Sequence, residues 1–373
     1  MKKILHIAND DKFVPLGKII FDSVNNVQND YWILPKEGDI EYCKFPCRNI
    51  YNLDFKSDKV IDEINTYDLL CIEFLNPKFY DILNHKNFDR STLWIGWGGD
   101  YYWLINTLSG FDILLPKTKK LIYKFHHKLL PTRIANSLKK FRRQKNYKAI
   151  QNIEYFAPPI FLDYKLIQDH YPNFKPKYIQ WNYGYINEAV LEHFSSLKTN
   201  GNKVMIGNSA TPSNNHLDVF YNLKDILSNQ KLIIPLNYGD MKYKNYLTRY
   251  LSIHFKVENI EILDKLLPST DFDNKLLECK NLIIGSMRQQ ALSTIIKALI
   301  FGLNVFLYER SINYTFLRQE GFHIQTIESL IKNPNLLNYN STSLQINENK
   351  QRIQELWSLS HNINQIQELM SNI

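Results

Sequence analysis

The sequence predicts an α/β protein with two Rossmann-like domains that face each other across a cleft. Short apolar segments alternate with helical stretches along most of the chain, which is typical of parallel sheets covered by helices. The alternation pauses in a stretch rich in Pro and Tyr between 157 and 185 and then starts again. A chain of 373 residues is long enough for two hydrophobic cores.

The first domain is expected over residues 1–185. Its predicted strands are short apolar runs that end at polar or glycine residues, and helical stretches lie between several of them. The expected strands are Lys3–Ala8, Tyr31–Leu34, Asp68–Phe74, Thr92–Trp97 and Asp112–Leu115, and the expected helices include Leu16–Asn26 and Pro77–Asn84.

The second domain is expected over residues 186–345, with a helical tail over 346–373. The same alternation repeats there, and the helical stretches are longer than in the first domain. The expected strands are Lys203–Ile206, Lys231–Leu236, Ile260–Leu263, Asn281–Gly285 and Asn304–Tyr308. The expected helices are Asn214–Ser228, Lys242–His254, Phe272–Glu278, Ala291–Phe301, Asn313–Glu320 and Asn347–Met370.

Positive charge is concentrated in one segment, 113–153, which we expect in the first domain. The formal net charge is +8, and this segment holds twelve Lys and Arg but no Asp or Glu. Aromatic and aliphatic residues interleave with the cations, as in a helix that lies on a membrane. We expect Lys117–Lys148 to contact an anionic membrane surface and not nucleic acid, because no nucleic-acid motif accompanies it. A solvated basic loop without a partner is the other interpretation.

The sequence predicts neither a membrane-spanning helix nor a metal site. The apolar tract Ala291–Tyr308 is interrupted by Lys297 and is shorter than the ~20 residues of a membrane span. Cys43 and Cys47 are spaced as metal ligands can be, but no second Cys or His pair follows at ligand spacing. We therefore expect reduced thiols.

Three loops of the second domain carry polar residues where a predicted strand gives way to a helix, the edge at which parallel α/β sheets bind ligands. The strongest follows Gly285, where Arg288 stands beside the start of an apolar helix. Unpaired N–H groups of that helix and the guanidinium would attract a diphosphate, although each loop could also be an ordinary capped turn. The residues expected to bind the phosphates and the group attached to them are Gly207, Asn208, Ser209, Tyr238, Arg288, Gln289, Gln290, Ser293 and Thr294.

Together these loops resemble the bacterial family-56 glycosyltransferases. The resemblance implies a GT-B fold, a dTDP-linked or other nucleotide-linked amino-deoxy sugar as donor, and a polyprenyl-diphosphate-linked saccharide as acceptor. It also implies a peripheral position at the cytoplasmic face of the bacterial inner membrane. The residues that carry it are Gly207-Asn208-Ser209, Ser213-Asn214-Asn215-His216, Ile234-Pro235-Leu236-Asn237-Tyr238-Gly239 and Arg288-Gln289-Gln290, and more weakly Trp97-Gly98-Gly99-Asp100. The sequence departs from the resemblance at Ala291, where a glycine-containing turn is expected.

The hydroxyl of a sugar acceptor needs a general base to remove its proton. The candidates are three carboxylates that follow predicted strands of the first domain: Asp10, Asp11 and Asp100. Nothing in the sequence selects one of the three. Arg288 would stabilise the negative charge of the leaving diphosphate, so that neither a metal nor another cofactor is expected. The D-x-D motif Asp271-Phe272-Asp273 opens a predicted helix, where acidic residues interact favourably with the helix dipole.

Other enzyme classes lack support. No G-x-G-x-x-G follows a strand, and neither a Walker loop nor G-x-S-x-G occurs, which argues against a dehydrogenase, an NTPase and an α/β hydrolase. Two alternatives stay open at this point: a nucleotide-sugar 2-epimerase on the same scaffold, and a non-catalytic protein that binds membranes or nucleic acid.

Overall fold

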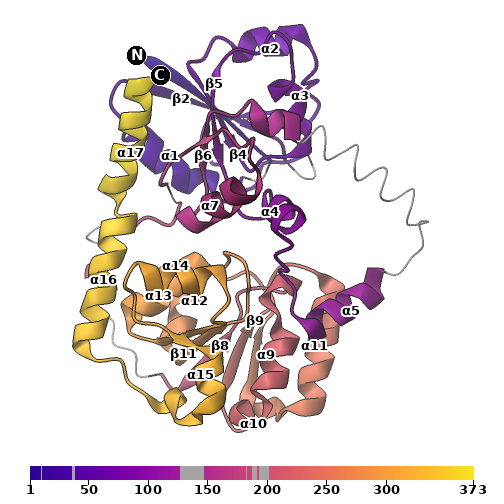
Figure 1. Cartoon of the computed structure of the whole chain (residues 1–373), viewed down its shortest axis with the longest axis vertical. Helices are drawn as coiled ribbons and strands as arrows, with labels where there is room; N and C mark the ends of the chain where they lie inside the picture. The colour runs from indigo at the N-terminus through magenta and orange to yellow at the C-terminus, as the bar shows by residue number, and fades with distance from the viewer. Residues whose placement is uncertain (10, 36–37, 127–146, 182, 187–190, 193–200) are drawn as a thin grey trace. The chain divides into compact units, whose positions relative to one another are not determined.

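The computed structural model describes residues 1–9, 11–35, 38–126, 147–181, 183–186, 191–192 and 201–373. These residues divide into two compact units (Figure 1). The first unit consists of Met1–Phe111, Leu129–Tyr185 and Trp357–Ile373, and the second of Asp112–Lys128 and Ile186–Leu356. The described start of the basic segment therefore groups with the second unit, whereas we expected it in the first. The end of the tail groups with the first unit.

The first unit is built on a seven-stranded parallel sheet in the order β3-β2-β1-β4-β5-β6-β7. Central strand β4 is buried along its whole length, as expected of a strand covered on both faces. The strands are β1 (Lys2–Ala8), β2 (Val27–Ile33), β3 (Arg48–Asn49), β4 (Leu69–Glu73), β5 (Ser91–Ile95), β6 (Tyr155–Ala157) and β7 (Lys177–Tyr178). The helices are α1 (Val14–Asp22), α2 (Asp58–Ile64), η1 (Pro77–Phe79), α3 (Tyr80–Leu83), α4 (Tyr102–Ser109), α7 (Phe161–His170) and α17 (Leu359–Asn372).

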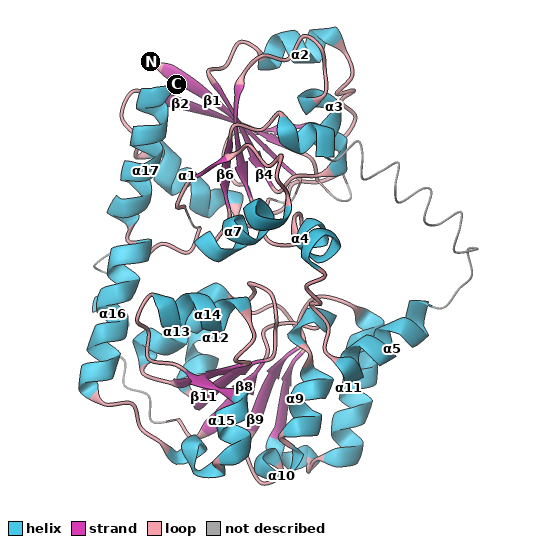
Figure 2. Cartoon of the chain, viewed as in Figure 1, coloured by secondary structure: helices cyan, strands magenta, loops and turns pink. Residues whose placement is uncertain are grey.

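The second unit is built on a six-stranded parallel sheet in the order β10-β9-β8-β11-β12-β13, flanked by helices (Figure 2). Its strands are β8 (Lys203–Ile206), β9 (Leu232–Pro235), β10 (Ile260–Leu263), β11 (Cys279–Ile284), β12 (Asn304–Leu307) and β13 (Gln325–Thr326). Its helices are α5 (Pro116–His126), η2 (Pro212–Asn214), α9 (His216–Asn222), α10 (Lys224–Leu227), α11 (Met241–His254), η3 (Val257–Asn259), α12 (Ser269–Leu277), α13 (Leu292–Phe301), α14 (Ile312–Gln319), α15 (Ile327–Lys332), η4 (Pro334–Asn338) and α16 (Ser343–Trp357).

Both sheets have the strand order of a doubly wound Rossmann-like fold, so the predicted fold class is confirmed. In this order the chain changes direction along the sheet between β1 and β4 in the first unit, and between β8 and β11 in the second. Ligands of such sheets bind beyond the carboxyl ends of the strands at this reversal. The topology therefore directs attention to the loops after β8 and β11.

The predicted strand Asp112–Leu115 is wrong, because this segment is a loop that leads into α5. The side chain of Asn215 accepts a hydrogen bond from the N–H of Leu115 at 2.9 Å and donates one to the carbonyl of Ile113 at 3.1 Å. These backbone groups are thus satisfied without a neighbouring strand. The structure also adds the short strands β3, β6, β7 and β13, which the sequence did not predict.

The predicted tail helix is divided at Ser358, whose side chain accepts a hydrogen bond from the N–H of His361 and so begins α17. Helix α17 packs against α1 in the first unit, where Ile366 and Leu369 join the core that contains Ile20 (Figure 1). Within the described residues, no helix combines the length and the apolar composition that crossing a bilayer requires.

Candidate functional site

The loop that follows β8 requires glycine at its first position. Gly207 has a φ of +74°, a backbone conformation that side chains with a Cβ rarely adopt. A Cβ built at this position would lie 2.2 Å from Nε2 of His216, which begins α9. Gly207 therefore allows the loop to pass directly over the buried imidazole of His216.

Hydrogen bonds join the loops after β8, β9 and β11 into one polar network. The side chain of Gln290 donates to Oδ1 of Asn208 at 3.1 Å and accepts from the hydroxyl of Ser213 at 2.6 Å. Asn208 donates in turn to the hydroxyl of Tyr238 at 3.4 Å, and Nε of Arg288 donates to Ser213 at 3.3 Å. The fold thus brings five residues together that are up to 82 positions apart in sequence.

The guanidinium of Arg288 lies at one end of this chain of hydrogen bonds, where two acceptors orient it. Besides the bond to Ser213, its Nη1 donates to the backbone carbonyl of Gln289 at 3.0 Å. The side chain of Tyr238 is 45% exposed beside it. Desolvation of the hydroxyl raises the pKa of Tyr238, while a hydrogen bond with Ser209 and the positive charge of Arg288 act in the opposite direction.

Helix α13 begins directly after this network. Ala291 precedes it in the left-handed conformation, with φ +61° and ψ +21°, and provides no side-chain cap. The predicted residues Ser293 and Thr294 lie in the first turn, with Ser293 exposed and Thr294 buried. No acidic residue neutralises this turn, so the positive end of the helix dipole adds to the charge of Arg288.

Five buried polar atoms at this edge of the second sheet have no hydrogen-bond partner among the described residues. Such groups are rare in native proteins, and each calls for an explanation. They come from the loops or helix starts that follow β8, β9, β11 and β12, so this edge holds several polar atoms that a polar ligand or bound water would satisfy. The atoms are Oδ1 of Asn214, Nε2 of His216, Oδ1 of Asn237, Oγ of Ser286 and Oδ1 of Asn313.

Comparison with known proteins decides the family. A family model described as 4-alpha-L-fucosyltransferase, glycosyl transferase group 56, matches residues 163–350, which is half of the chain. The chain belongs to glycosyltransferase family 56. The matched residues include all the loops of the second unit described above, and family membership makes the chain a glycosyltransferase.

Solved structures with the same architecture are GT-B glycosyltransferases. Anabaena HepE, in complex with UDP and glucose, has a TM-score of 0.63 at 12% identity, with all of both chains covered. Sucrose-phosphate synthase from Thermosynechococcus elongatus has a TM-score of 0.64 at 10% identity, covering 100% of this chain and 99% of that one. A glycosyltransferase from Rickettsia africae has a TM-score of 0.60 at 13% identity, covering 100% and 98%. These likenesses show the GT-B fold, and no curated protein matches this glycosyltransferase.

The carboxylates that the sequence singled out in the first unit differ in their surroundings. Asp100 is buried and accepts hydrogen bonds from the N–H groups of Leu75 (3.0 Å) and Trp97 (2.9 Å) and from the indole of Trp94 (2.7 Å). Burial raises the pKa of Asp100, and these donors oppose the rise. Three donors around a buried carboxylate are the environment of a residue that organises a loop.

Asp11 also holds a loop, through a single oxygen. Its Oδ2 accepts hydrogen bonds from the N–H groups of Tyr42 and Cys43, the latter at 3.0 Å. Asp11 is 8% exposed and follows β1, next to the reversal point of the first sheet. Asp10, the third candidate, lies outside the described residues.

The D-x-D residues lie in α12, where Asp271 is in the first turn as expected. Asp273 is buried and forms an ion pair with Lys297 of α13, with Nζ–O distances of 2.6 and 2.9 Å. This pair ties α12 to α13 and gives Asp273 a structural partner.

Sequence reasoning missed a buried cluster in the first unit of the glycosyltransferase. Nδ1 of His6 lies 2.9 Å from Oε1 of Glu73, and the hydroxyl of Tyr183 donates to Oε2 of Glu73 at 2.7 Å. Cys71 completes a group of three possible metal ligands whose donor atoms lie within 4.8 Å of one another. Nε2 of His6 also lies 3.3 Å from Oδ1 of Asn29, so both ring nitrogens already have protein partners. The cluster is explained as a buried hydrogen-bond network.

The sequence expectation also left Ser213, Asn214, His216 and Asn313 out of the site. The first three stand in the polar run Ser213-Asn214-Asn215-His216 that follows β8, and this run was the available signal. Asn313 donates to the carbonyl of Gln290 at 2.7 Å and so fixes the start of α13 from the neighbouring α14. Burial lowers the pKa of His216 to about 3, so its imidazole is neutral at physiological pH.

Proposed function

We propose that this glycosyltransferase moves an amino-deoxy sugar from a dTDP-linked donor to a polyprenyl-diphosphate-linked oligosaccharide. The sugar would be of the 4-acetamido-4,6-dideoxygalactose type, as for the family's TDP-N-acetylfucosamine:lipid II N-acetylfucosaminyltransferase. The reaction would serve a bacterial surface polysaccharide, either a common antigen or an O-antigen. The enzyme would work as a peripheral protein at the cytoplasmic face of the inner membrane.

One observation carries the proposal for the donor: a hydrogen-bond network joins Asn208, Ser213, Tyr238, Arg288 and Gln290 at the carboxyl edge of the second sheet. A nucleoside diphosphate offers phosphate oxygens for the guanidinium and for the first turn of α13. It also offers a base that can stack on the exposed ring of Tyr238. The UDP bound to Anabaena HepE supports a pyrimidine nucleotide in the same fold.

The sugar class rests on the family. The description of the matched family names a fucosyl group, which is a 6-deoxy sugar and agrees with a deoxy-sugar donor. The polyprenyl-linked acceptor follows the resemblance. The lysines of α5, the described start of the Lys117–Lys148 segment, are consistent with a membrane-bound acceptor.

During transfer the bond between the anomeric carbon and the donor diphosphate breaks, and negative charge grows on the leaving diphosphate. In this proposal Arg288 and the N–H groups of α13 stabilise that charge, and we therefore expect the step to proceed without a metal ion. The acceptor hydroxyl must lose a proton to a base, for which Asp10, Asp11 and Asp100 are our candidates. Of the two described carboxylates we favour Asp11, because Asp100 already accepts three hydrogen bonds, whereas Asp11 accepts two through one oxygen.

Calorimetric titration of the full chain with dTDP, UDP and GDP tests the donor site. We expect the two pyrimidine diphosphates to bind, and Arg288→Ala to weaken their binding while Arg249→Ala on α11 does not. A chain that binds none of the three has a different function. A transfer assay with dTDP-4-acetamido-4,6-dideoxygalactose and a synthetic polyprenyl-diphosphate disaccharide then tests the substrates. If the donor sugar is instead inverted at carbon 2 in an assay without acceptor, the enzyme is a 2-epimerase.

A further inference from the structure

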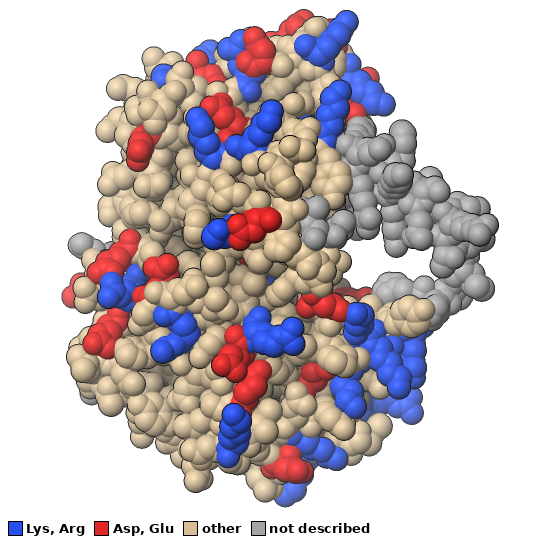
Figure 3. Space-filling view, viewed as in Figure 1, with Lys and Arg blue, Asp and Glu red and all other residues tan. Residues whose placement is uncertain are grey.

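A pocket of about 170 Å³ lies between α5, α9 and α11 of the second unit, formed by none of the donor-site residues. Three lysines and three tyrosines dominate its lining, and no acidic side chain takes part. Figure 3 shows Lys and Arg gathered over α5. The lining residues are Lys117, Lys120, Leu121, Lys124, Leu217, Tyr221, Tyr246 and Tyr250.

The pocket is held together by the first turn of α9. One carboxylate oxygen of Asp218 accepts from the N–H of Lys117 and the other from the N–H of Thr118, both at 2.9 Å. Asp218 therefore caps the start of α5 and fixes this helix on the second unit. Both oxygens of this buried carboxylate are thus used by backbone N–H groups at the start of α5.

The lysines are arranged as a binding site for an anion. Nζ of Lys117 lies 3.6 Å from the ring centre of Tyr221, a cation–π contact that places the charge at the wall of the pocket. Lys120 and Lys124 stand one helical turn apart, so their like charges repel each other. An anion between them would relieve this repulsion.

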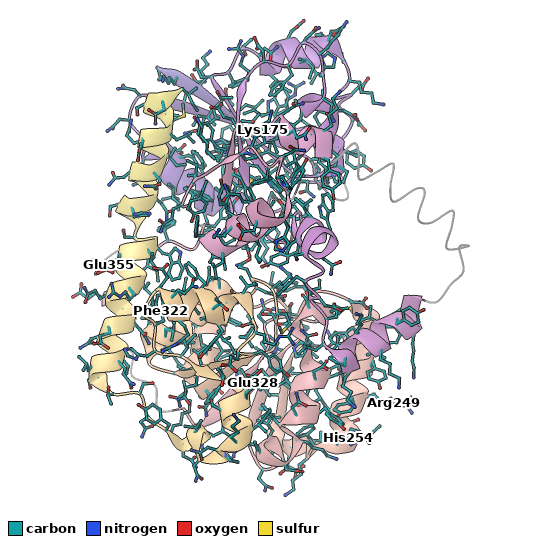
Figure 4. The ribbon with its side chains drawn as sticks, in the orientation of Figure 1. Lys175, Arg249, His254, Phe322, Glu328 and Glu355 are labelled. Carbon is teal, nitrogen blue, oxygen red and sulfur yellow. The ribbon has the colours of Figure 1, made fainter. Side chains whose placement is uncertain are left out.

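The size and surroundings of the pocket favour a phosphate on a larger amphipathic molecule. The volume is below the ~300–1,000 Å³ of sites that enclose a whole small molecule. The pocket therefore suits the phosphate group of a larger molecule, the rest of which stays outside the pocket. Tyr246, Tyr250 and Ile253 follow one face of α11 at positions i, i+4 and i+7, and Ile253 is 65% exposed. Figure 4 labels Arg249 and His254 on the same helix. Exposed tyrosines beside lysines are typical of protein surfaces at a membrane interface.

We propose that this pocket binds the phosphate of an anionic lipid headgroup, and so anchors the second unit to the membrane surface. Lys120 and Lys124 would donate to the phosphate oxygens, while Tyr221 and Tyr250 form the walls. This inference deepens the membrane contact proposed above. It is tested without sugar donor, so that its failure leaves the proposed transfer reaction unaffected.

The test is co-sedimentation of the full chain with phosphatidylcholine vesicles, with or without phosphatidylglycerol. We expect binding to the anionic vesicles alone. The double variant Lys120→Ala/Lys124→Ala should lower the partition coefficient roughly 30-fold, because each lysine near an anionic surface contributes about 1 kcal/mol. The matched control Lys242→Ala/Lys256→Ala removes two exposed lysines of the same unit outside the pocket and should change binding less than about threefold.

A variant without charge change separates a pocket from a diffuse patch. Tyr221→Ala removes an exposed wall, and the proposal expects about fivefold weaker binding to anionic vesicles with unchanged dTDP affinity. If both lysine double variants lose the same vesicle affinity and Tyr221→Ala binds as the wild type does, the pocket is not the lipid site. Titration with inorganic pyrophosphate distinguishes a lipid from a soluble ligand. If the wild type binds pyrophosphate but not vesicles, and Lys120→Ala/Lys124→Ala abolishes the binding of pyrophosphate, the ligand of the pocket is a soluble phosphate and the assignment to lipid is wrong. Preferential binding of a short single-stranded RNA would overturn the assignment to lipid.

Discussion

Replacement of Arg288 by alanine should slow sugar transfer by roughly 30- to 1,000-fold. The guanidinium is already oriented by Ser213 at 3.3 Å and by the carbonyl of Gln289 at 3.0 Å, so in the proposed reaction it would stabilise charge on the leaving diphosphate with little rearrangement. Loss of one such preorganised donor typically raises the barrier by about 2–4 kcal/mol, which gives this range of rates. Because the charge grows towards the transition state, kcat should fall more than dTDP affinity.

The assay compares single-turnover rates of wild type, Arg288→Ala and Arg288→Lys with dTDP-sugar and polyprenyl-linked acceptor. The lysine variant keeps the charge but loses the planar donor group that contacts Ser213, so we expect an intermediate rate. Arg249→Ala on α11 serves as the control, and urea unfolding checks that each variant is folded. Turnover of Arg288→Ala within about threefold of wild type would refute the role given to this residue.

Three further predictions concern the same unit. Ala291 has a φ of +61°, which costs a residue other than glycine about 1–2 kcal/mol, whereas glycine loses about 0.5–1 kcal/mol more backbone entropy on folding. Ala291→Gly should therefore stabilise the second unit by roughly 0.5–1 kcal/mol in urea titration, and a lower midpoint would contradict this strain. Burial lowers the pKa of His216 from 6.5 to about 3, so below pH 6.5 the unfolded chain binds a proton that the folded chain does not. Stability should fall by about 2 kcal/mol between pH 6.5 and about pH 5, and His216→Phe should remove this part of the pH dependence measured by unfolding. Finally, EDTA should leave transfer unchanged, because in the proposed reaction Arg288 and the start of α13 supply the positive charge. Complete loss of transfer that Mg²⁺ restores would return Asp271 and Asp273 to consideration as metal ligands.

The fold was predictable where apolar runs alternate clearly with helices. Strands β8 and β11 stand out because each finishes in a buried apolar run that a glycine follows. The apolar run Ile113–Leu115 has the same appearance, but its backbone is satisfied by Asn215, about 100 positions later, and no pattern in the sequence shows that contact. Strand β6 was missed because Tyr155–Ala157 is short and runs into Pro158, which resembles a linker.

The sequence was sufficient to predict which loops form the candidate site, but not which of their side chains contact one another. The rule that parallel sheets bind ligands at their carboxyl edge selected Asn208, Tyr238 and Arg288, and the structure joins them in one network. The link through Ser213 depends on how η2 packs over Gly285, whose built Cβ would lie 2.5 Å from the carbonyl oxygen of Asn214. Such close approaches arise from tertiary packing, which sequence periodicity does not encode.

A crystal structure of the chain with dTDP is the most direct test of the proposed donor site. We expect phosphate oxygens within hydrogen-bond distance of Arg288 and of the first-turn N–H groups of α13, with thymine against the ring of Tyr238. A nucleotide held by the loops of the first unit, or a guanidinium directed away from the diphosphate, would contradict it.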